Sequence, residues 1–326
     1  TLSTDKVGGD DVTVGTTGAS FGSKTVGTDK AVSVSGISIT GGADATNYTL
    51  GNATASTTAT ITARTLTVSG ATPTDRPYNG TTSVAITGAT LVNTVTGDDV
   101  TLADADTGTI ATASVGTDKP VTTAFTITGA DIGNYALVQP TDLAVDITQA
   151  ATTVTITCTP SVVYTGAAQT PCTASVTGAG GLGEALDVSY GPNTNVGTVN
   201  VSAFYAGTSD YAADTDSTSF DITKKQLSVN ADPQTKVYGE TDPDLTWSYS
   251  GFVDGESASN VTITGSASCS RAPGESVAGS PYAITCLPGT LASANYSFAT
   301  GATANLTITA KPVTVTPGKL RGPSPP

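Results

Sequence analysis

Apolar residues alternate with Thr, Ser and Asp through most of the chain. Clear instances are residues 144–148 (Ala-Val-Asp-Ile-Thr) and residues 153–157 (Thr-Val-Thr-Ile-Thr). A period of two is typical of strands, because successive side chains of a strand point to opposite faces of a sheet. No window has the spacing of a good amphipathic helix. We therefore predict an all-β chain.

Short sequence words recur along the chain in a fixed order. They are Gly-Asp-Asp-Val-Thr at 9–13 and 97–101, Val-Gly-Thr-Asp-Lys at 26–30 and 115–119, and Asn-Tyr-x-Leu at 47–50 and 134–137. An Ile-Thr pair, followed at once by a new strand pattern, begins at residues 61, 147, 222 and 308. Such self-similarity indicates a tandem array of small structural units.

The Ile-Thr pairs divide the chain into four repeats and a tail. These are repeat 1 (1–63), repeat 2 (64–149), repeat 3 (150–224), repeat 4 (225–310) and the tail (311–326). About seven short strands with frequent turn signals in each full repeat predict an immunoglobulin-like β-sandwich. Because the junctions contain no flexible linker, we expect the sandwiches to follow one another end to end.

Tyrosines occupy two recurrent positions in the repeats. An Asn-Tyr or Asp-Tyr word precedes the last strand at Tyr48, Tyr135, Tyr211 and Tyr296. A Tyr-x-Gly turn follows the first strand at Tyr78 and Tyr164, and its counterpart at Tyr238 is Tyr-Gly. In a sandwich, a tyrosine before the last strand can bury its ring and bond its hydroxyl to the backbone. We therefore expect a structural role for the first group in preference to ligand contact.

The two ends of the chain align with interior parts of a repeat. Residues 1–4 align with residues 90–93, so repeat 1 is expected to lack about the first 26 residues of repeat 2. The tail aligns with the opening of a further repeat, and its residues Val313, Thr314, Val315 and Thr316 are a candidate donor strand. We expect copies of the chain to associate head to tail through this strand; the alternative is that both ends are simply frayed.

Composition excludes several classes of function. The chain has no His and no Met, and its net charge is −14 with no basic run, which disfavours nucleic acid as a partner. No apolar run approaches the ~20 residues of a membrane helix, so no membrane insertion is expected in this segment. A Gly-x-Ser-x-Gly match at 18–22 has no following helix and no His partner, and we expect no enzyme activity.

Four cysteines allow three disulfide connectivities. We favour pairing within repeats, Cys158 with Cys172 and Cys269 with Cys286, because the middle of each intervening segment carries turn residues and the pair would then face across two antiparallel strands. Free thiols are the alternative. A zinc site is disfavoured, because no Cys-x-x-Cys occurs. Disulfides would indicate an oxidising compartment outside the cytoplasm.

One acidic group has the residue types of a calcium site. Asp98, Asp99, Asp104 and Asp106 supply the oxygen ligands that Ca²⁺ prefers, and strand alternation places Asp104 and Asp106 on one face. The chain has no EF-hand loop, and repeat 1 has Val-Gly-Thr-Thr in the place of part of this stretch. The alternative is a solvated loop of turn-forming aspartates. No cofactor is expected, with Ca²⁺ as the one candidate.

Several motifs resemble known repeat families of bacterial surface proteins. Repeats 1 and 2 resemble the YDG domain, with Tyr-Asn-Gly-Thr-Thr at 78–82 in place of the usual Tyr-Asp-Gly-Thr. Repeat 4 resembles the MBG-type domain through Lys-Val-Tyr-Gly at 236–239 and Gly-Phe-Val-Asp-Gly at 251–255, and repeat 3 is similar to a related immunoglobulin-like repeat. The resemblance implies an extracellular stalk or fibre segment without catalytic residues. The alternative is an adhesin module that binds a glycan or a host protein through its loops.

Overall fold

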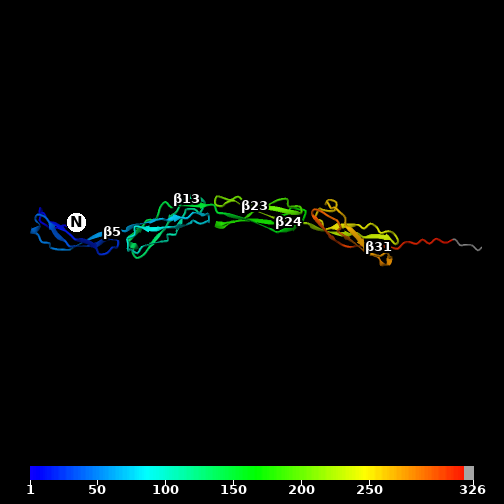
Figure 1. The fold of residues 1–326 in the computed structure, drawn as a ribbon, viewed down its shortest axis with the longest axis horizontal. Coiled ribbons are helices and arrows are strands. Elements are labelled where there is room, and N and C mark those ends of the chain that lie inside the picture. The colour runs from blue at the N-terminus through cyan, green and yellow to red at the C-terminus, as the bar shows by residue number, and fades with distance from the viewer. Residues whose placement is uncertain (319–326) are drawn as a thin grey trace, which may run out of the picture. The chain divides into compact units, whose positions relative to one another are not determined.

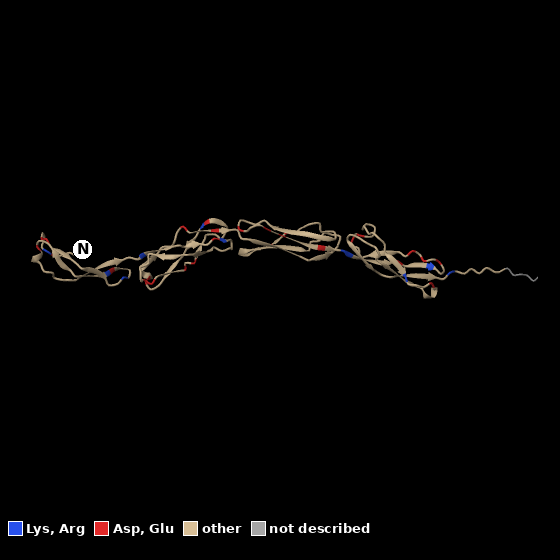
Figure 2. Ribbon diagram, viewed as in Figure 1, with Lys and Arg blue, Asp and Glu red and all other residues tan. Residues whose placement is uncertain are grey.

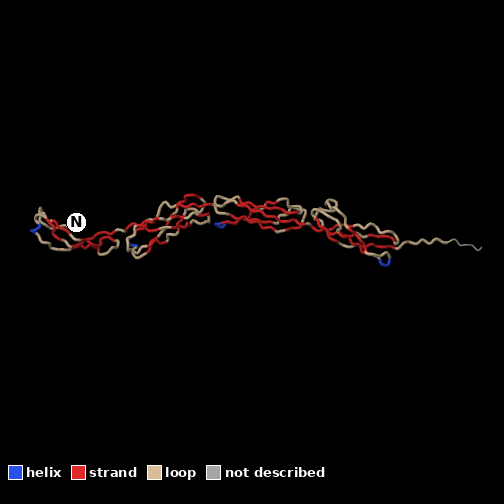
Figure 3. Tube along the Cα trace, viewed as in Figure 1, coloured by secondary structure: helices blue, strands red, loops and turns tan. Residues whose placement is uncertain are grey.

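A computed structural model describes residues 1–318. The chain divides into two compact units, and each is described by itself: unit 1 is Thr1–Ala151 with Thr208–Ala212, and unit 2 is Thr152–Gly207 with Ala213–Pro326. Strands dominate both units (Figures 1 and 3), which confirms the all-β prediction. Within residues 1–318, helix is limited to four single turns: η1 (Ala45–Asn47), η2 (Ile132–Asn134), η3 (Ala179–Gly181) and η4 (Val277–Gly279).

Unit 1 contains the strands of repeats 1 and 2. Repeat 1 has β1 (Thr13–Gly15), β2 (Gly18–Phe21), β3 (Gly27–Ser35), β4 (Ser38–Gly41) and β5 (Ala55–Ile61), in sheets β1-β4 and β2-β3-β5. Repeat 2 has β6 (Arg64–Ser69), β7 (Thr72–Pro73), β8 (Arg76–Pro77), β9 (Ser83–Thr87), β10 (Thr90–Val92), β11 (Thr101–Ala103), β12 (Thr107–Thr109), β13 (Gly116–Pro120), β14 (Thr122–Thr123), β15 (Thr126–Thr128), β16 (Tyr135–Leu137) and β17 (Ala144–Thr148). Its sheets are β10-β6-β16, β11-β15, β14-β12-β9-β7 and β13-β17-β8.

Unit 2 contains most of repeat 3 and all of repeat 4, with seven strands from each. Repeat 3 has β18 (Thr152–Cys158), β19 (Ser161–Val163), β20 (Cys172–Gly178), β21 (Leu182–Leu186), β22 (Ser189–Tyr190), β23 (Gly197–Tyr205) and β24 (Asp214–Thr223), in sheets β18-β20-β21 and β19-β24-β23-β22. Repeat 4 has β25 (Lys225–Ala231), β26 (Gln234–Val237), β27 (Trp247–Ser250), β28 (Ser268–Arg271), β29 (Tyr282–Leu287), β30 (Tyr296–Thr300) and β31 (Ala304–Thr309), in sheets β27-β25-β30 and β26-β31-β29-β28.

Every named strand pairs only with strands of its own repeat. Repeat 2 has twelve short strands where about seven were expected, and the pairing of β13 with β17 is irregular between Gly116 and Lys119. In the tail, residues 311–318 are in no strand, and residues 319–326 lie outside the described residues. The repeat boundaries near residues 63, 149, 224 and 310 remain a prediction.

The first residue of a repeat pairs in parallel with the tyrosine of its own Asx-Tyr word. The pairs are Arg64 with Tyr135, Lys225 with Tyr296, and an isolated bridge from Ala150 to Tyr211. Two parallel strands must be joined by a long crossover connection, and here that connection is nearly the whole repeat. The point where the chain enters a repeat therefore lies beside the Asx-Tyr word.

The cores follow the alternation read from the sequence. In repeat 2, Val84, Ile86, Val145 and Ile147 are buried in one cluster with Phe125. In unit 2, one cluster joins both repeats, since Tyr164, Val199 and Phe220 of repeat 3 share it with Leu227 and Tyr296 of repeat 4. Repeats 3 and 4 are thus packed together, which the expectation of separate sandwiches did not foresee.

Among residues 1–318, the buried charged side chain is that of Lys236. Asp and Glu are distributed over all four repeats and outnumber Lys and Arg by 27 to 13 (Figure 2). No helix in residues 1–318 is long and apolar enough to cross a membrane.

Candidate functional site at the repeat junctions

The same hydrogen bond forms at three successive junctions. The backbone N–H of a valine in one repeat donates to the side-chain Oδ1 of the Asx-Tyr word in the next repeat. The three bonds are Val26 to Asn134 (3.0 Å), Val115 to Asp210 (2.8 Å) and Val196 to Asn295 (3.1 Å). The first two lie within unit 1 and the third lies within unit 2.

The strand register explains why these groups meet. The glycine after each valine lies opposite the isoleucine of the closing Ile-Thr pair: Gly27 opposite Ile61, Gly116 opposite Ile147 and Gly197 opposite Ile222. The valine therefore lies at the exit end of its repeat. The Asx-Tyr word lies at the entry end of the following repeat, and only a few residues separate exit from entry. Chain continuity thus brings the amide and the side-chain oxygen together.

A tyrosine hydroxyl fixes the acceptor word inside its own repeat. The hydroxyl of Tyr135 accepts from the backbone N–H of Val95 (3.1 Å) and donates to Asp98 Oδ2 (2.7 Å). Tyr48 makes the same two bonds with Val7 and Asp10, and Tyr296 makes them with Val253 and Glu256. In these three repeats the tyrosine does bond the backbone as expected.

These contacts raise the pKa of the phenols above their ordinary value of 10. Burial, with a smaller contribution from the bond to Asp98, raises the pKa of Tyr135. Burial and the bond to Glu256 raise the pKa of Tyr296 to about 12. A neutral hydroxyl that both donates and accepts suits a structural tie between two loops.

The first junction also carries an ion pair. Lys24, two residues before Val26, lies 2.6 Å from Asp98 Oδ1 and 2.9 Å from Asp131 Oδ1. The bonds from Lys24 and Tyr135 lower the pKa of Asp98. The Asp99 amide and then Lys24 lower the pKa of Asp131. Because the Lys24 side chain is 60% exposed, the ion pair contributes little to stability, and its main effect is to orient the Lys24 loop against Asp98 and Asp131.

The Tyr-x-Gly tyrosines contribute to two junctions. Each donates its backbone N–H to the threonine carbonyl of the closing Ile-Thr pair: Tyr78 to Thr148, Tyr164 to Thr223 and Tyr238 to Thr309. From this position the Tyr78 ring contacts Tyr211 edge-on with centroids 5.3 Å apart, and Tyr164 contacts Tyr296 at 5.5 Å. Tyr164 also donates to Glu256 Oε1 (2.6 Å). An edge-to-face aromatic pair contributes about 0.5–1.5 kcal/mol beyond burial.

The candidate calcium ligands do not converge. Asp98 binds Lys24 and Tyr135, Asp99 accepts from the amide of Ala130 (3.0 Å), and Asp104 accepts from Thr126 Oγ1 (2.6 Å). The carbonyl of Asp106 accepts from the Ile86 amide. No group of three or more His, Cys, Asp or Glu within residues 1–318 is arranged to hold a metal ion. Their placement fits the alternative reading as turn aspartates, with Asp98 serving the junction.

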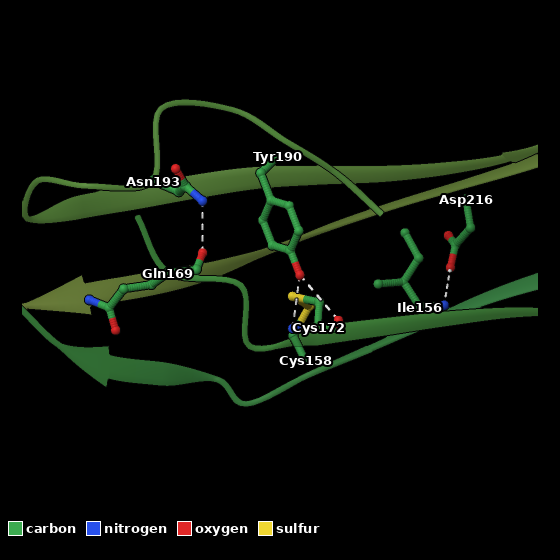
Figure 4. Close-up of a disulfide and its surroundings, with 7 residues drawn as sticks. All are labelled: Ile156, Cys158, Gln169, Cys172, Tyr190, Asn193 and Asp216. Atoms are coloured by element: carbon green, nitrogen blue, oxygen red, sulfur yellow. Dashed lines mark hydrogen bonds between the residues drawn. A yellow bond between two sulfur atoms is a disulfide. The ribbon is translucent and has the colours of Figure 1, made fainter. Parts of the chain in front are cut away.

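Two disulfides join the cysteine pairs that the sequence favoured. Cys158 bonds to Cys172 across β18 and β20, and Cys269 bonds to Cys286 across β28 and β29. In repeat 3 the Tyr190 hydroxyl accepts from the Cys172 N–H and donates to its carbonyl, both at 3.1 Å (Figure 4). Other residues around this disulfide also bond one another: the Ile156 N–H donates to Asp216 Oδ2 (3.1 Å), and Asn193 donates to the Gln169 carbonyl (2.8 Å).

A charge cluster around the buried Lys236 in repeat 4 was not expected from the sequence. Lys236 is 6% exposed, and its Nζ lies 2.6 Å from Asp242 Oδ1 and 2.5 Å from Glu275 Oε2. Arg271 pairs with the same two carboxylates. The bond from Arg271 and then that from Lys236 lower the pKa of Asp242 to about 2. A buried ammonium with two carboxylate partners is costly to leave unpaired.

We expect acid to destabilise repeat 4 through this cluster. A carboxylate with a lowered folded-state pKa contributes stability that is complete above its ordinary pKa of 3.8 and is lost as pH falls toward about 2. The sole tryptophan, Trp247, packs in the core of repeat 4 and reports its unfolding. The melting temperature followed by Trp247 fluorescence should fall between about pH 4 and pH 2.

The matched variant for this prediction is Asp242→Asn. It should melt at a lower temperature at neutral pH and show a smaller decrease between about pH 4 and pH 2 than the wild type. Equal pH dependence in both proteins would show that Asp242 does not carry the effect.

The words that form the junctions can be recognised in the sequence, but their contacts cannot be predicted from it. Val-Gly, Asn-Tyr and Tyr-x-Gly were found as recurrent words, but the bond from valine amide to Asx side chain was not predicted. The signal that could have indicated this bond is the recurrence of the words at matching positions of the repeats. A word that repeats with different cores share points to a contact that they also share. The Asp-Tyr word of repeat 3 takes the place of Asn-Tyr, and its Asp210 is the acceptor at the second junction.

Comparisons with known families agree with this repeat organisation. The family model described as the YDG domain matches residues 1–59 and 62–143, and that of the MBG domain (YGX type) matches residues 227–307. Neither match includes repeat 3. A search of curated proteins finds no match. The YDG and MBG domains are non-enzymatic repeat families that typically occur in surface proteins. The chain is therefore a tandem array that contains two YDG domains and one MBG domain of the YGX type.

Proposed function

We propose that this chain is a structural stalk segment of an extracellular bacterial surface protein. The observation that carries the proposal is the recurrent bond from a valine amide to an Asx side chain at three junctions. At the first and third junctions, each of which lies inside one compact unit, such a contact restricts the rotation of one repeat against the next. Restricted junctions are what a semi-rigid spacer needs, whereas a flexible tether would have free linkers.

The short connections between repeats support the same function. β5 ends at Ile61 and β6 begins at Arg64, while β24 ends at Thr223 and β25 begins at Lys225. With one or two residues between strands, the backbone has few torsions about which neighbouring repeats could swing. The shared core of repeats 3 and 4 adds apolar burial across their boundary.

The two disulfides support a location outside the cytoplasm. Disulfides persist in oxidising compartments and are rare where thioredoxin and glutathione keep thiols reduced. Both bonds cross adjacent strands, where they staple a sheet. A stalk at the cell surface, with further copies added head to tail, is the assembly that we propose.

Distance measurements across the first junction test the stalk function. Spin labels placed on β5 of repeat 1 and on β9 of repeat 2 should give one narrow distance distribution in the wild type. Asn134→Ala removes the acceptor for the Val26 amide, which should cost about 1 kcal/mol and broaden the distribution.

Two further variants serve as controls. Asn134→Asp keeps an acceptor oxygen, as Asp210 does at the second junction, and should retain the narrow distribution. Asn47→Ala changes the same word in repeat 1, where the Asn47 side chain has no hydrogen bond among residues 1–318, and should have no effect. A broad distribution in the wild type would refute the stalk proposal.

A further inference from the structure

The Val-Gly-Thr-Asp-Lys words of repeats 1 and 2 form a β-bulge at the exit end of each repeat. In repeat 1, Gly27 lies opposite Ile61 and Lys30 lies opposite Ala59, so β3 has one residue more than β5 over this stretch. The pairing of β13 with β17 has the same extra residue. A bulge redirects side chains near it away from regular alternation. The lysine that ends each word follows the bulge directly.

The aspartate before each lysine has the backbone conformation that the bulge requires. Asp29 has a φ of 51° and Asp118 has a φ of 49°, and both values lie in the left-handed region. Aspartate adopts this region more readily than most residues, because its short polar side chain can bond locally. The shared word therefore gives both repeats the same local turn.

In repeat 1 the lysine turns back onto the loop that carries the valine donor. We call residues 23–26 the exit loop of repeat 1. The Lys30 ammonium donates to Ser23 Oγ (2.7 Å) and to Thr25 Oγ1 (2.6 Å), and these two hydroxyl oxygens lie 3.0 Å apart. Val26, the donor at the first junction, follows Thr25 directly. The ammonium thus fixes the residues immediately before the donor.

Repeat 2 has the same arrangement, and its exit loop is residues 112–115. The Lys119 ammonium donates to Thr112 Oγ1 (3.0 Å) and to the Ser114 carbonyl (2.6 Å), and Ser114 Oγ donates to Thr112 Oγ1 (3.2 Å). Val115, the donor at the second junction, follows Ser114 directly. In both repeats the partners are the residues seven and five positions before the lysine.

The glycine of each word leaves room for the lysine side chain. A Cβ on Gly27 would lie 3.1 Å from Lys30 Cδ, and a Cβ on Gly116 would lie 3.4 Å from Lys119 Cδ. At Gly197, the corresponding glycine of repeat 3, no atom lies within 4 Å of such a Cβ. The close approach in repeats 1 and 2 is therefore an approach to the lysine.

The third junction is built without this lysine. β23 pairs with β24 in unbroken register from Gly197 onward, so the bulge is absent there. Asn195, which precedes the donor Val196, instead accepts a hydrogen bond from Asn295 Nδ2 (3.0 Å) in the next repeat. The donor loop of repeat 3 is thus held by the repeat that follows it, whereas those of repeats 1 and 2 are held by a lysine of their own repeat.

We propose that Lys30 and Lys119 are positioning residues of the first two junctions, and that each fixes its exit loop so that the valine N–H meets the Asx side chain. This inference rests on the proposed function, because it assigns both lysines to the contact that carries it. Neither lysine is in an ion pair within residues 1–318, so its ammonium serves the loop oxygens. In repeat 1 the same loop carries Lys24, and fixing it orients two contacts at once.

Amide exchange of the junction valines, followed by NMR on the full chain, tests the proposal. Lys30→Met keeps the length of the side chain and removes the ammonium. The Val26 amide should then exchange roughly tenfold faster than in the wild type, because its loop is no longer held against the acceptor. Lys119→Met makes the matched change in repeat 2. It should accelerate exchange at Val115 and leave Val26 unchanged.

A distance measurement separates positioning from a general weakening of repeat 1. With spin labels on β5 and β9, Lys30→Met should broaden the distribution across the first junction. In a background that lacks both junction contacts, Lys24→Met with Asn134→Ala, Lys30→Met should add no further broadening. Amides of β5 should keep their wild-type protection in the Lys30 variant, because the partners of Lys30 lie in the exit loop.

Unchanged Val26 exchange in Lys30→Met would overturn the proposal. Further broadening in the Lys24/Asn134 background, or lost protection in β5, would also overturn it, since either would mean that Lys30 stabilises repeat 1 as a whole. A broad distribution in the wild type refutes the stalk function alone. Faster Val26 exchange in Lys30→Met would still support the positioning role in that case, because exchange reports the loop and not the distance between repeats.

Discussion

Replacing Leu227 by alanine should lower the free energy of unfolding of unit 2 by about 2–5 kcal/mol. Leu227 is fully buried at the start of repeat 4, and its cluster includes Tyr164, Val199 and Phe220 of repeat 3. A cavity at this point therefore removes contacts from both repeats. Denaturant unfolding measures the loss.

Hydrogen exchange followed by mass spectrometry locates the effect of Leu227→Ala. Amides of β24 in repeat 3 and of β25 in repeat 4 should lose protection together, because one cluster supports both. Gln226→Ala, at the exposed neighbouring position, should leave protection unchanged. Loss confined to repeat 4 would mean that the shared cluster does not couple the two repeats.

Removing the two disulfides should destabilise unit 2 by a comparable amount. The cysteines are separated by 14 and 17 residues in sequence, and closing loops of this size stabilises the folded state by about 3 kcal/mol each. The effect comes mainly from restricting the unfolded chain. The variants Cys158→Ser with Cys172→Ser, and Cys269→Ser with Cys286→Ser, should each lower the denaturant midpoint.

Repeat 2 provides the control within the same molecule. It contains no cysteine, so protection of β9 and β17 should be the same in the oxidised chain, the reduced chain and both double variants. If β9 and β17 lost protection on reduction, the loss would have to come from something other than the disulfides.

The sequence predicted the parts of the fold that depend on local pattern. Alternation predicted the strands, and turn residues between the cysteines indicated the pairs Cys158–Cys172 and Cys269–Cys286. Tyr48, Tyr135 and Tyr296 bond the backbone as expected, because a recurrent tyrosine before the last strand has few other roles in a sandwich. The signals for these features, alternation, turn residues and a recurrent word, can each be recognised in a short stretch of sequence.

The features that the sequence missed depend on register between distant strands. Val26 and Asn134 are separated by 108 residues, and only the pairing of Gly27 with Ile61 and of Arg64 with Tyr135 brings them together. Nothing in the sequence around Lys236 distinguishes it from an exposed lysine. Its side chain can be buried because Asp242 and Glu275, which lie in separate loops, both pair with it. The aspartate group around Asp98 was a candidate calcium site with a loop of turn-forming aspartates as the alternative, and sequence spacing does not show that Lys24 lies beside Asp98.

The junction contact has a consequence for how such a protein can change in length. The donor at each junction is a backbone N–H, which every residue except proline possesses, and the acceptor is Asn at the first and third junctions and Asp at the second. A duplication or deletion of one whole repeat therefore joins an exit to an entry that can still form the bond. Lineages could lengthen or shorten this protein by unequal recombination without new mutations at the boundary, so the number of repeats should vary more freely between strains than the sequence of the junction words.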